Sequence, residues 1–288
     1  MNVGIFSFAR RHNRAYEKCG SSIIRAKWMW ENWPDAEEYV EGKKYDVVIF
    51  QKVWWPEMLK IHTGIKILDL CDPEWLQSRW PIVEIAHQVD AIVVSSKGLR
   101  DALQKIIPEK VCPIVWIDDR IDSKFAGDFK KKHSGNAKRV AWYGYRHNGN
   151  QAIPQVLPTL KRLGLELHII CENRLEFAGF ENMVTYSEFN WNTLAYELMS
   201  CDIVLNPPVM SPYAQYKSLN KTYLAWAFGM PVAHNGDELR AFLTEESRIK
   251  EGERVSELVK KEYNTTKSVE EYKNLITKLC QKKGITLS

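Results

Sequence analysis

The sequence predicts two α/β domains, each built on a doubly wound parallel sheet, with a helix at the C-terminus. Short apolar runs rich in Val and Ile recur along the chain, and near-continuous runs of this kind are typical of parallel strands buried on both faces. Amphipathic stretches alternate with them, which favours helices on both faces of a sheet. A polar segment interrupts the pattern, and 288 residues suffice for two domains of about 130 to 140 residues.

The first domain is expected over residues 1–121. Its strand candidates are 3–8, 46–50, 66–70, 91–94 and 113–117. The helix candidates between them are 21–30, 75–87 and 97–106.

Residues 122–138 are polar with few large apolar side chains, and we interpret them as a linker. The second domain is expected over 139–267. Its strand candidates are 140–143, 166–170, 183–186, 202–205 and 231–233, and its helix candidates are 152–163, 193–199 and 219–228. Pro158 is expected to start or kink the first of these helices.

The last segment, 268–288, carries apolar residues at helical spacing on an otherwise charged stretch. They are Val269, Tyr272, Leu275, Ile276 and Leu279. We expect this helix to pack back on the first domain.

Bulk composition excludes few functions. The net charge of +4 is too mild to indicate a nucleic-acid partner by itself. The six cysteines form no CxxC pair, and we expect buried free thiols. No apolar run approaches the ~20 residues of a membrane helix. Because the first residues enter a strand directly, we expect no signal peptide and a cytoplasmic protein.

In open α/β sheets, ligands bind beyond the carboxyl ends of the strands. The loop after strand 140–143 contains Gly144, Arg146 and Asn148, which would suit a phosphate. Further on, Lys217-Ser218-Leu219-Asn220-Lys221 is expected to open a helix with Ser218 as its N-cap. Two lysines at a helix N-terminus are unfavourable unless an anion lies there. The alternative is a capped amphipathic helix with solvated lysines.

The stretch KSLNKTYLAWAFGMPVA closely resembles the donor-binding signature of retaining GT-B glycosyltransferases, group 1-like. That signature is a basic or polar helix start, a run of small residues, then Gly-x-Pro-Val. The strand at 202–205, followed by Asn-Pro-Pro, is also similar to the family. The resemblance covers the C-terminal half well and the N-terminal half in outline.

This resemblance implies two Rossmann-like domains facing a cleft. It also implies a nucleotide-diphosphate sugar as co-substrate, no cofactor, no metal, and retention at the anomeric carbon. Arg146, Lys217 and Lys221 would neutralise the donor diphosphate, and Ser218 and Asn220 would add polar contacts. One departure concerns Leu224, which stands where many relatives have a ribose-binding glutamate. The nucleotide is therefore left open.

The strand ends of the first half predict an acceptor site. Its residues are expected to be Arg10, Arg11 and Arg14 after the first strand, Trp54 and Trp55 after the second, and Asp72 and Trp75 after the third. Aromatic faces can stack on a sugar or a base. Asp72 is the best-placed carboxylate to act on the transferred sugar or the acceptor hydroxyl, although an Asx turn before Pro73 would equally explain it.

Ser21 and Ser22 open the first helix candidate, with Arg25 one turn further on. Their backbone N–H groups and the guanidinium would suit a donor phosphate. The alternative is a flexible basic loop with a capped helix.

Three functions remain after this reasoning. The first is a glycosyltransferase that acts on a glycan or a small molecule. The second has a hydroxymethylated base in DNA as the acceptor, as in phage-type DNA glycosyltransferases, since arginines and tryptophans suit a flipped base and its phosphates. The third is a non-catalytic two-lobed binder of a phosphorylated ligand.

Overall fold

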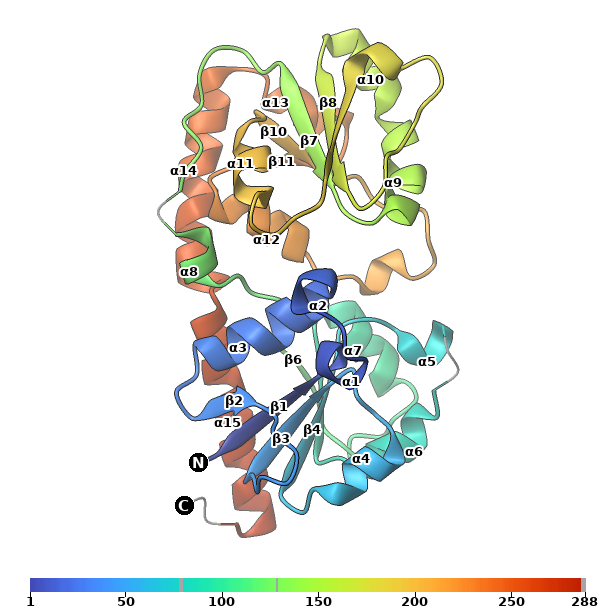
Figure 1. Ribbon diagram of the computed structural model, residues 1–288, viewed down its shortest axis with the longest axis vertical. Helices are drawn as coiled ribbons and strands as arrows, with labels where there is room; N and C mark the ends of the chain where they lie inside the picture. Colours follow the sequence, from blue (N-terminus) through green and yellow to red (C-terminus); the bar gives the residue numbers. More distant parts are fainter. Residues whose placement is uncertain (78–79, 128, 286–288) are drawn as a thin grey trace. The chain divides into compact units, whose positions relative to one another are not determined.

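The computed structural model describes residues 1–77, 80–127 and 129–285, and it contains two parallel sheets (Figure 1). The chain divides into two compact units. Unit 1 comprises Met1–Asp122, Gln215–Ser218 and the chain from Tyr263 onward. Unit 2 comprises Ser123–Ala214 and Leu219–Glu262. The predicted α/β class with two Rossmann-like units is confirmed.

The sheet of unit 1 has the strand order β2-β1-β3-β4-β5-β6, and all neighbours are parallel. Its strands are β1 (Val3–Ser7), β2 (Ala36–Glu38), β3 (Val47–Gln51), β4 (Ile65–Leu70), β5 (Ala91–Val94) and β6 (Ile114–Trp116). The five predicted strands are present. The edge strand β2 was not predicted, because its three residues are half-buried and two of them are glutamates.

Helices cover both faces of this sheet. They are α1 (Phe8–Arg11), η1 (Tyr16–Lys18), α2 (Gly20–Ser22), the π-helical turn η2 (Ile23–Lys27), α3 (Trp28–Glu31), α4 (Pro56–Ile61), α5 (Glu74–Gln77), α6 (Ile82–Ala86), α7 (Lys97–Gln104) and α15 (Thr265–Lys283). The single helix predicted over 75–87 is two short helices, and residues 78 and 79 of that range lie outside the described chain. The helix predicted over 21–30 is present but changes its winding at η2.

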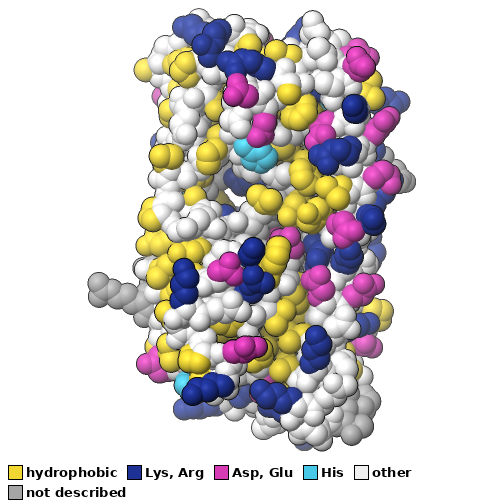
Figure 2. All heavy atoms as spheres, turned by 180° about the vertical axis from the view of Figure 1, so that it is seen from behind, with side chains coloured by type: hydrophobic (Ala, Val, Ile, Leu, Met, Phe, Trp, Pro, Cys, Tyr) yellow, Lys and Arg dark blue, Asp and Glu magenta, His cyan; other side chains and the backbone are white. Residues whose placement is uncertain are grey.

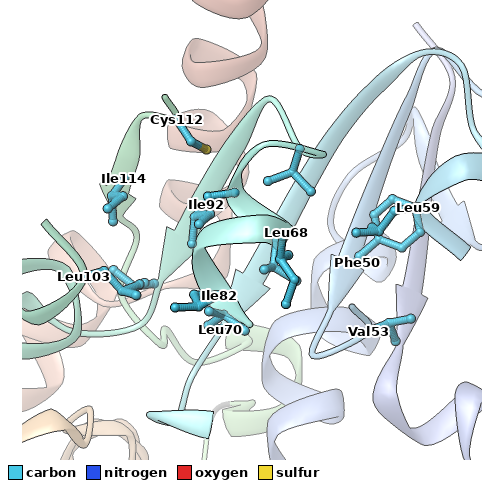
Figure 3. Packing of buried hydrophobic residues seen from close by; sticks show 14 of the residues in the cluster. Phe50, Val53, Leu59, Leu68, Leu70, Ile82, Ile92, Leu103, Cys112 and Ile114 are labelled. Carbon is cyan, nitrogen blue, oxygen red and sulfur yellow. The ribbon is translucent and has the colours of Figure 1, made fainter. Parts of the chain in front are cut away.

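The two faces of the sheet have separate cores. On one face, Phe50 of β3 and Leu68 of β4 pack with Leu59 of α4, Ile82 of α6 and Leu103 of α7 (Figure 3). On the other face, α15 packs against the strands. Its buried residues Val269, Tyr272, Leu275, Ile276 and Leu279 share a cluster with Val3, Ile5 and Ile49. The C-terminal helix therefore packs back on the first sheet, as predicted.

Unit 2 has a five-stranded parallel sheet in the order β11-β10-β7-β8-β9. Its strands are β7 (Arg139–Tyr143), β8 (Glu166–Cys171), β9 (Val184–Glu188), β10 (Ile203–Leu205) and β11 (Val232–Ala233). Its helices are α8 (Ser123–Ala126), α9 (Arg146–Ala152), η3 (Ile153–Gln155), α10 (Leu157–Leu163), η4 (Glu181–Met183), α11 (Leu194–Met199), α12 (Asn220–Ala227), α13 (Gly236–Ala241) and α14 (Glu245–Glu262). The short helix η5 (Ala214–Tyr216) begins at the last residue of unit 2 before Gln215 and continues into the unit 1 segment.

Local details agree with the chemistry of the sequence. Pro158 lies in the first turn of α10, as predicted, because its ring allows the helical φ and its missing N–H has no partner there. All six cysteines are free and buried, also as predicted. Among the described helices, none is both long and apolar enough to cross a bilayer. On the face shown in Figure 2, Lys and Arg side chains are interspersed with Asp and Glu.

Candidate functional site

The loop that follows β7 in unit 2 meets the start of α12. Gly144 directly follows β7 and has φ +146°, a conformation that favours glycine. A Cβ at this position would collide with Nζ of Lys221, the second residue of α12. The φ of Gly144 therefore favours glycine, and the ammonium group of Lys221 lies directly against the backbone of the loop. Below, this arrangement is called the Gly144–Lys221 site.

Aromatic residues of β7 hold Lys221 in place. Its Nζ lies 5.2 Å from the ring centroid of Trp142 and 5.7 Å from that of Tyr143. The Tyr143 hydroxyl donates a hydrogen bond of 2.6 Å to the carbonyl oxygen of Lys221. Burial raises the pKa of Tyr143, so the phenol stays protonated and the bond persists at neutral pH. The start of α12 is thereby attached to the end of β7.

The expected N-cap of α12 is wrong. The helix begins at Asn220 and is preceded by Leu219, which has no polar side chain to cap it. Ser218 instead donates its hydroxyl to Asp119 of unit 1. Lys217 lies before the helix and forms an ion pair with Asp72 of unit 1. Of the two predicted lysines, Lys221 alone is therefore part of α12.

Arg146 and Asn148 lie on the first turn of α9, just after Gly144. The Arg146 side chain is exposed, and its backbone N–H donates to Oε1 of Glu172 at 2.9 Å. The first backbone N–H of α9 is thus already bound by a carboxylate. Asn148 is half-buried.

In unit 1, a charged cluster lies beyond the ends of β3 and β4. Lys52 Nζ is 2.8 Å from Oδ2 of Asp72 and 2.7 Å from Oε1 of Glu74. Lys217 pairs with the other oxygen of Asp72. Below, Lys52, Asp72, Glu74 and Lys217 are called the Lys52 cluster.

Lys52 is the residue of this cluster that sequence reasoning missed. Its φ is +55°, in the left-handed region that a side chain other than glycine seldom adopts. Its side chain is only 15% exposed. Strained backbone of this kind persists where the surroundings hold it, and it gathers at functional sites. Nothing in the residue types around Lys52 indicates a positive φ, so the sequence carries no signal for it.

The two carboxylates of the cluster differ in their electrostatics. Burial alone would raise the pKa of Asp72, but Lys52 and Lys217 outweigh it and hold that pKa far below its usual range. Burial raises the pKa of Glu74 to about 7, against the opposing effect of Lys52. Oε2 of Glu74 is buried and has no hydrogen-bond partner within the described chain. Asp72 is therefore ionised at neutral pH, whereas Glu74 titrates near it.

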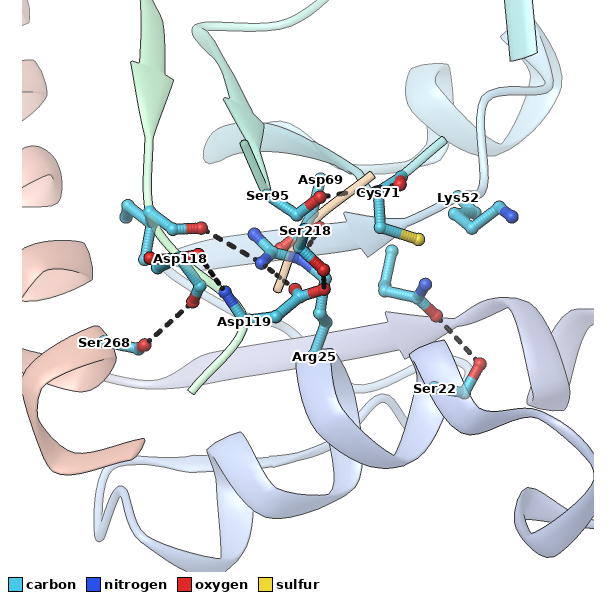
Figure 4. Close-up of polar contacts among 12 residues, drawn as sticks. Ser22, Arg25, Lys52, Asp69, Cys71, Ser95, Asp118, Asp119, Ser218 and Ser268 are labelled. Atoms are coloured by element: carbon cyan, nitrogen blue, oxygen red, sulfur yellow. Dashed lines mark hydrogen bonds and ion pairs between the residues drawn. The ribbon is translucent and has the colours of Figure 1, made fainter. Parts of the chain in front are cut away.

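Arg25 and Ser22, both predicted to face a donor phosphate, are built into the interior of unit 1. The Arg25 guanidinium is buried and binds Asp69 at 2.5 Å and Asp119 at 2.6 Å. In Figure 4 the side chains of Arg25 and Ser218 both point toward the carboxylate of Asp119. Ser22 is fully buried and donates its hydroxyl to Gln51 at 2.9 Å. Ser21 is half-buried. The π-helical turn at η2 directs Arg25 inward, which helical spacing alone did not indicate.

The predicted acceptor residues differ in their surroundings: Trp75 is buried, whereas the three arginines lie beside a carboxylate or an aromatic ring. Trp75 belongs to the hydrophobic core and is not available to a ligand. Nη1 of Arg10 lies 3.6 Å from Oε1 of Glu38, which makes an ion pair. Arg11 lies 4.6 Å from the ring centroid of Trp55, and Arg14 lies 5.7 Å from that of Phe8.

An aromatic stack accompanies these arginines. The rings of Trp54 and Trp55 are stacked with their centroids 5.5 Å apart, and the centroid of Trp54 is also 4.5 Å from that of Trp80. His12 is 4.2 Å from Phe8 and 5.6 Å from Trp55, measured between ring centroids. The structure therefore joins the segments that follow β1, β3 and β4 through Phe8, His12, Trp55, Trp54 and Trp80. Hereafter these five residues are the aromatic stack.

Metal binding has no clear candidate in the part of the chain that the structure describes. Within it, no three His, Cys, Asp or Glu side chains are grouped to hold an ion.

Comparison by sequence identifies no relative, since no protein-family model and no curated protein matches the chain. Comparison of structures does. An α-glucosyltransferase solved with UDP-glucose and DNA containing an abasic site is similar at TM-score 0.68 and 14% identity, over 96% of this chain and 99% of that one. HepE from Anabaena, solved with UDP and glucose, is similar at TM-score 0.67 and 10% identity, over 96% and 100%.

TarM is similar at TM-score 0.63 and 15% identity over 85% of this chain, which spans 55% of TarM's length. Another similar structure is a catalytic domain of starch synthase IV from Arabidopsis thaliana, bound to ADP and acarbose. The fold is therefore the GT-B fold of these glycosyltransferases, as the sequence resemblance implied.

Proposed function

We propose that this chain is a glycosyltransferase that moves a sugar from a nucleotide-diphosphate sugar to a hydroxyl acceptor. The Gly144–Lys221 site carries the proposal. It brings a fixed ammonium group and the start of an eight-residue helix to the carboxyl end of a parallel sheet, which is where α/β sheets bind phosphates. The GT-B fold supports the same conclusion.

The chemistry follows from charge. Cleavage of the bond between the anomeric carbon and the phosphate oxygen leaves negative charge on the diphosphate. Lys221 and the dipole of α12 would stabilise that charge, with Arg146, Asn148 and Asn220 as further donors. Because Lys217 and Ser218 already bind carboxylates of unit 1, we assign them to that unit and not to the donor.

We further propose that transfer needs no metal ion and retains the anomeric configuration, as the resemblance implies. Activity that survives EDTA and an NMR spectrum of the retained anomer would support both points. We place the reaction in the cytoplasm, where six free thiols stay reduced.

A donor screen tests the function. UDP-, GDP-, ADP- and TDP-glucose are added one at a time, and the melting temperature and nucleotide release are measured. A donor at one hundred times its dissociation constant stabilises by about 2.7 kcal/mol. Lys221→Ala should abolish the shift, whereas Lys250→Ala on the exposed face of α14 should not. Binding without release of nucleotide would favour the non-catalytic binder, and no response to any of the four donors would sink the proposal.

A second candidate names DNA as the acceptor. Arg11 and Arg14 lie against the aromatic stack, so cations and π-faces are available together, as nucleic acid requires. One structurally similar enzyme was solved with DNA. With a hydroxymethylated DNA acceptor, the double variant Arg10→Ala, Arg11→Ala should raise KM and flatten its salt dependence by about one unit of slope per lost phosphate contact. With a neutral sugar acceptor, KM should barely change.

A further inference from the structure

His12 is the member of the aromatic stack that can carry a proton. It directly follows α1, beyond the carboxyl end of β1. Its ring packs on Phe8 at 4.2 Å and edge-on to Trp55 at 5.6 Å. The residue is exposed, and no described residue forms a hydrogen bond with its ring nitrogens. The imidazole is therefore oriented by its neighbours' faces while its nitrogen atoms stay open to a ligand.

The charges around His12 favour its neutral form. Partial burial, then Arg14, then Arg11, lower the pKa of His12 below its usual value of 6.5. Lys52, from the loop after β3, lies 5.5 Å from the centroid of the Phe8 ring, which His12 also contacts. No carboxylate contributes to the shift. At neutral pH the ring therefore has one nitrogen lone pair free to accept a proton.

Asp72, the carboxylate that the sequence favoured, is poorly suited to this step. Each of its oxygens is bound by a lysine, and its pKa lies far below the usual range. A base of such low pKa has little driving force to remove a hydroxyl proton. Glu74 has a higher pKa, but both of its oxygens are buried.

We propose that His12 accepts the proton of the acceptor hydroxyl during sugar transfer, an inference that rests on the proposed function. The acceptor oxygen bonds to the anomeric carbon from the face that the diphosphate leaves, which retains the anomeric configuration, and its proton moves to a ring nitrogen of His12. The bond between that carbon and the diphosphate oxygen breaks, and the electron pair leaves with the diphosphate. The imidazolium then returns its proton to solvent. The competing proton acceptor is the leaving diphosphate itself.

The test compares His12→Gln with wild type, using whichever of the four nucleotide glucoses is turned over. Acceptors are water, maltose and duplex DNA containing 5-hydroxymethylcytosine. His12→Gln should reduce kcat by about 100- to 10,000-fold. The donor-induced shift in melting temperature should not change, and added imidazole should restore part of the rate. His87→Gln, an exposed histidine on the C-cap of α6, is the matched control and should retain full activity.

A pH profile gives a second readout that a structural role would not move. The acidic limb of kcat/KM should titrate below the usual histidine range, and NMR of the His12 ring should give the same pKa. The double variant Arg11→Gln, Arg14→Gln should raise the pKa seen in the kcat/KM profile and the pKa measured by NMR by the same amount. An active wild type whose kcat survives His12→Gln would overturn the inference and leave the diphosphate as the proton acceptor. A wild type that turns over no donor would overturn the proposed function, and the inference with it.

Discussion

At the scale of single residues, the backbone of Lys52 makes a direct prediction. A left-handed φ costs a residue with a Cβ roughly 1 kcal/mol or more, whereas glycine adopts it freely. Lys52→Gly and Lys52→Ala remove the same charge and the same ion pairs. The glycine variant should therefore be the more stable by about 1 kcal/mol in urea denaturation, which reverses the usual order of the two residues. Equal stability would show that φ is negative in solution.

Glu74 predicts a pH-dependent stability. Its pKa is about 7 in the folded protein and 4.5 in the reference state, so the unfolded chain ionises first as the pH rises. The stability that the neutral carboxyl contributes is present below about pH 4.5 and is lost as the pH rises through 7. Glu74→Gln cannot ionise. Relative to wild type, it should gain about 1 to 3 kcal/mol in free energy of unfolding between about pH 5 and pH 8.

The control for this prediction is Asp72→Asn, whose carboxyl has the opposite shift. Removal of that carboxylate should lower the free energy of unfolding across the same pH range, because the Asp72 charge is paired with Lys52 and Lys217. A stability difference for Glu74→Gln that does not vary with pH would mean that the pKa of Glu74 is not raised by folding.

Sequence reasoning placed residues correctly where their position follows from a strand end. Gly144 follows β7 and Asp72 lies just beyond β4, because the loops after buried parallel strands gather at one edge of a sheet. Their roles in binding or catalysis stay predictions. Sequence reasoning failed where a side chain's direction decides. Trp75 was predicted from a strand end and Arg25 from a helix start, yet Arg25 is buried in an ion-pair network and Trp75 in the core. A cation or an indole after a strand does not itself reveal which way it points.

At the scale of elements, the loop between β7 and α9 carries the sharpest prediction for donor binding. Gly144→Ala would place a methyl group against Lys221 Nζ and strain a φ of +146°. The displaced ammonium group of Lys221 would lose its proposed charge-assisted contact with the donor diphosphate. Donor binding should then weaken by about 1.5 to 3 kcal/mol, which is roughly a ten- to hundredfold rise in Kd by calorimetry.

Gly164→Ala is the matched control. Gly164 also has a positive φ, +67°, at the C-cap of α10, but a Cβ there would meet nothing within 4 Å. Its replacement should cost about 1 kcal/mol of stability and leave donor affinity unchanged. If the two variants lose the same donor affinity, backbone strain explains the effect and the contact with Lys221 does not.

Strands were predictable and helix ends were less so. Val- and Ile-rich runs mark β3, β5 and β7 because strands buried on both faces need little else. The start of α12 was placed too early, since Ser218 is a good capping residue by type but its hydroxyl binds Asp119. The Ser218 hydroxyl thus binds a residue distant in the sequence and does not cap the helix, and the local sequence does not indicate such a distant partner.

At the scale of the whole molecule, chain order and compact units do not coincide. Gln215–Ser218 lie between two elements of unit 2 but belong to unit 1. Ser96 donates its hydroxyl to the carbonyl of Tyr216 at 2.7 Å, and Gly98 leaves room for the carbonyl of Gln215. These contacts use backbone atoms of the segment, so its side chains did not indicate them. The C-terminal helix was predictable because its apolar stripe needs a partner surface.

Because α15 covers one face of the unit 1 sheet, a chain that ends at Glu262 should expose Val3, Ile5 and Ile49. Hydrogen exchange should then accelerate in β1, β3 and β4, at the opposite end of the sequence, while β7 and β8 stay protected.

Tyr272→Phe is the milder variant, because it removes only the hydroxyl that donates to the buried Asp69. Asp69 would keep Arg25 as its partner, so the cost should be about 1 to 3 kcal/mol by urea denaturation, and the protein should stay folded. Exchange in β4 should rise by the same free energy, since Asp69 lies on that strand and its carboxylate stays buried with one donor fewer. Unchanged protection of the unit 1 strands in both variants would mean that the sheet is stable without α15, and that the helix contributes nothing to the first unit's fold.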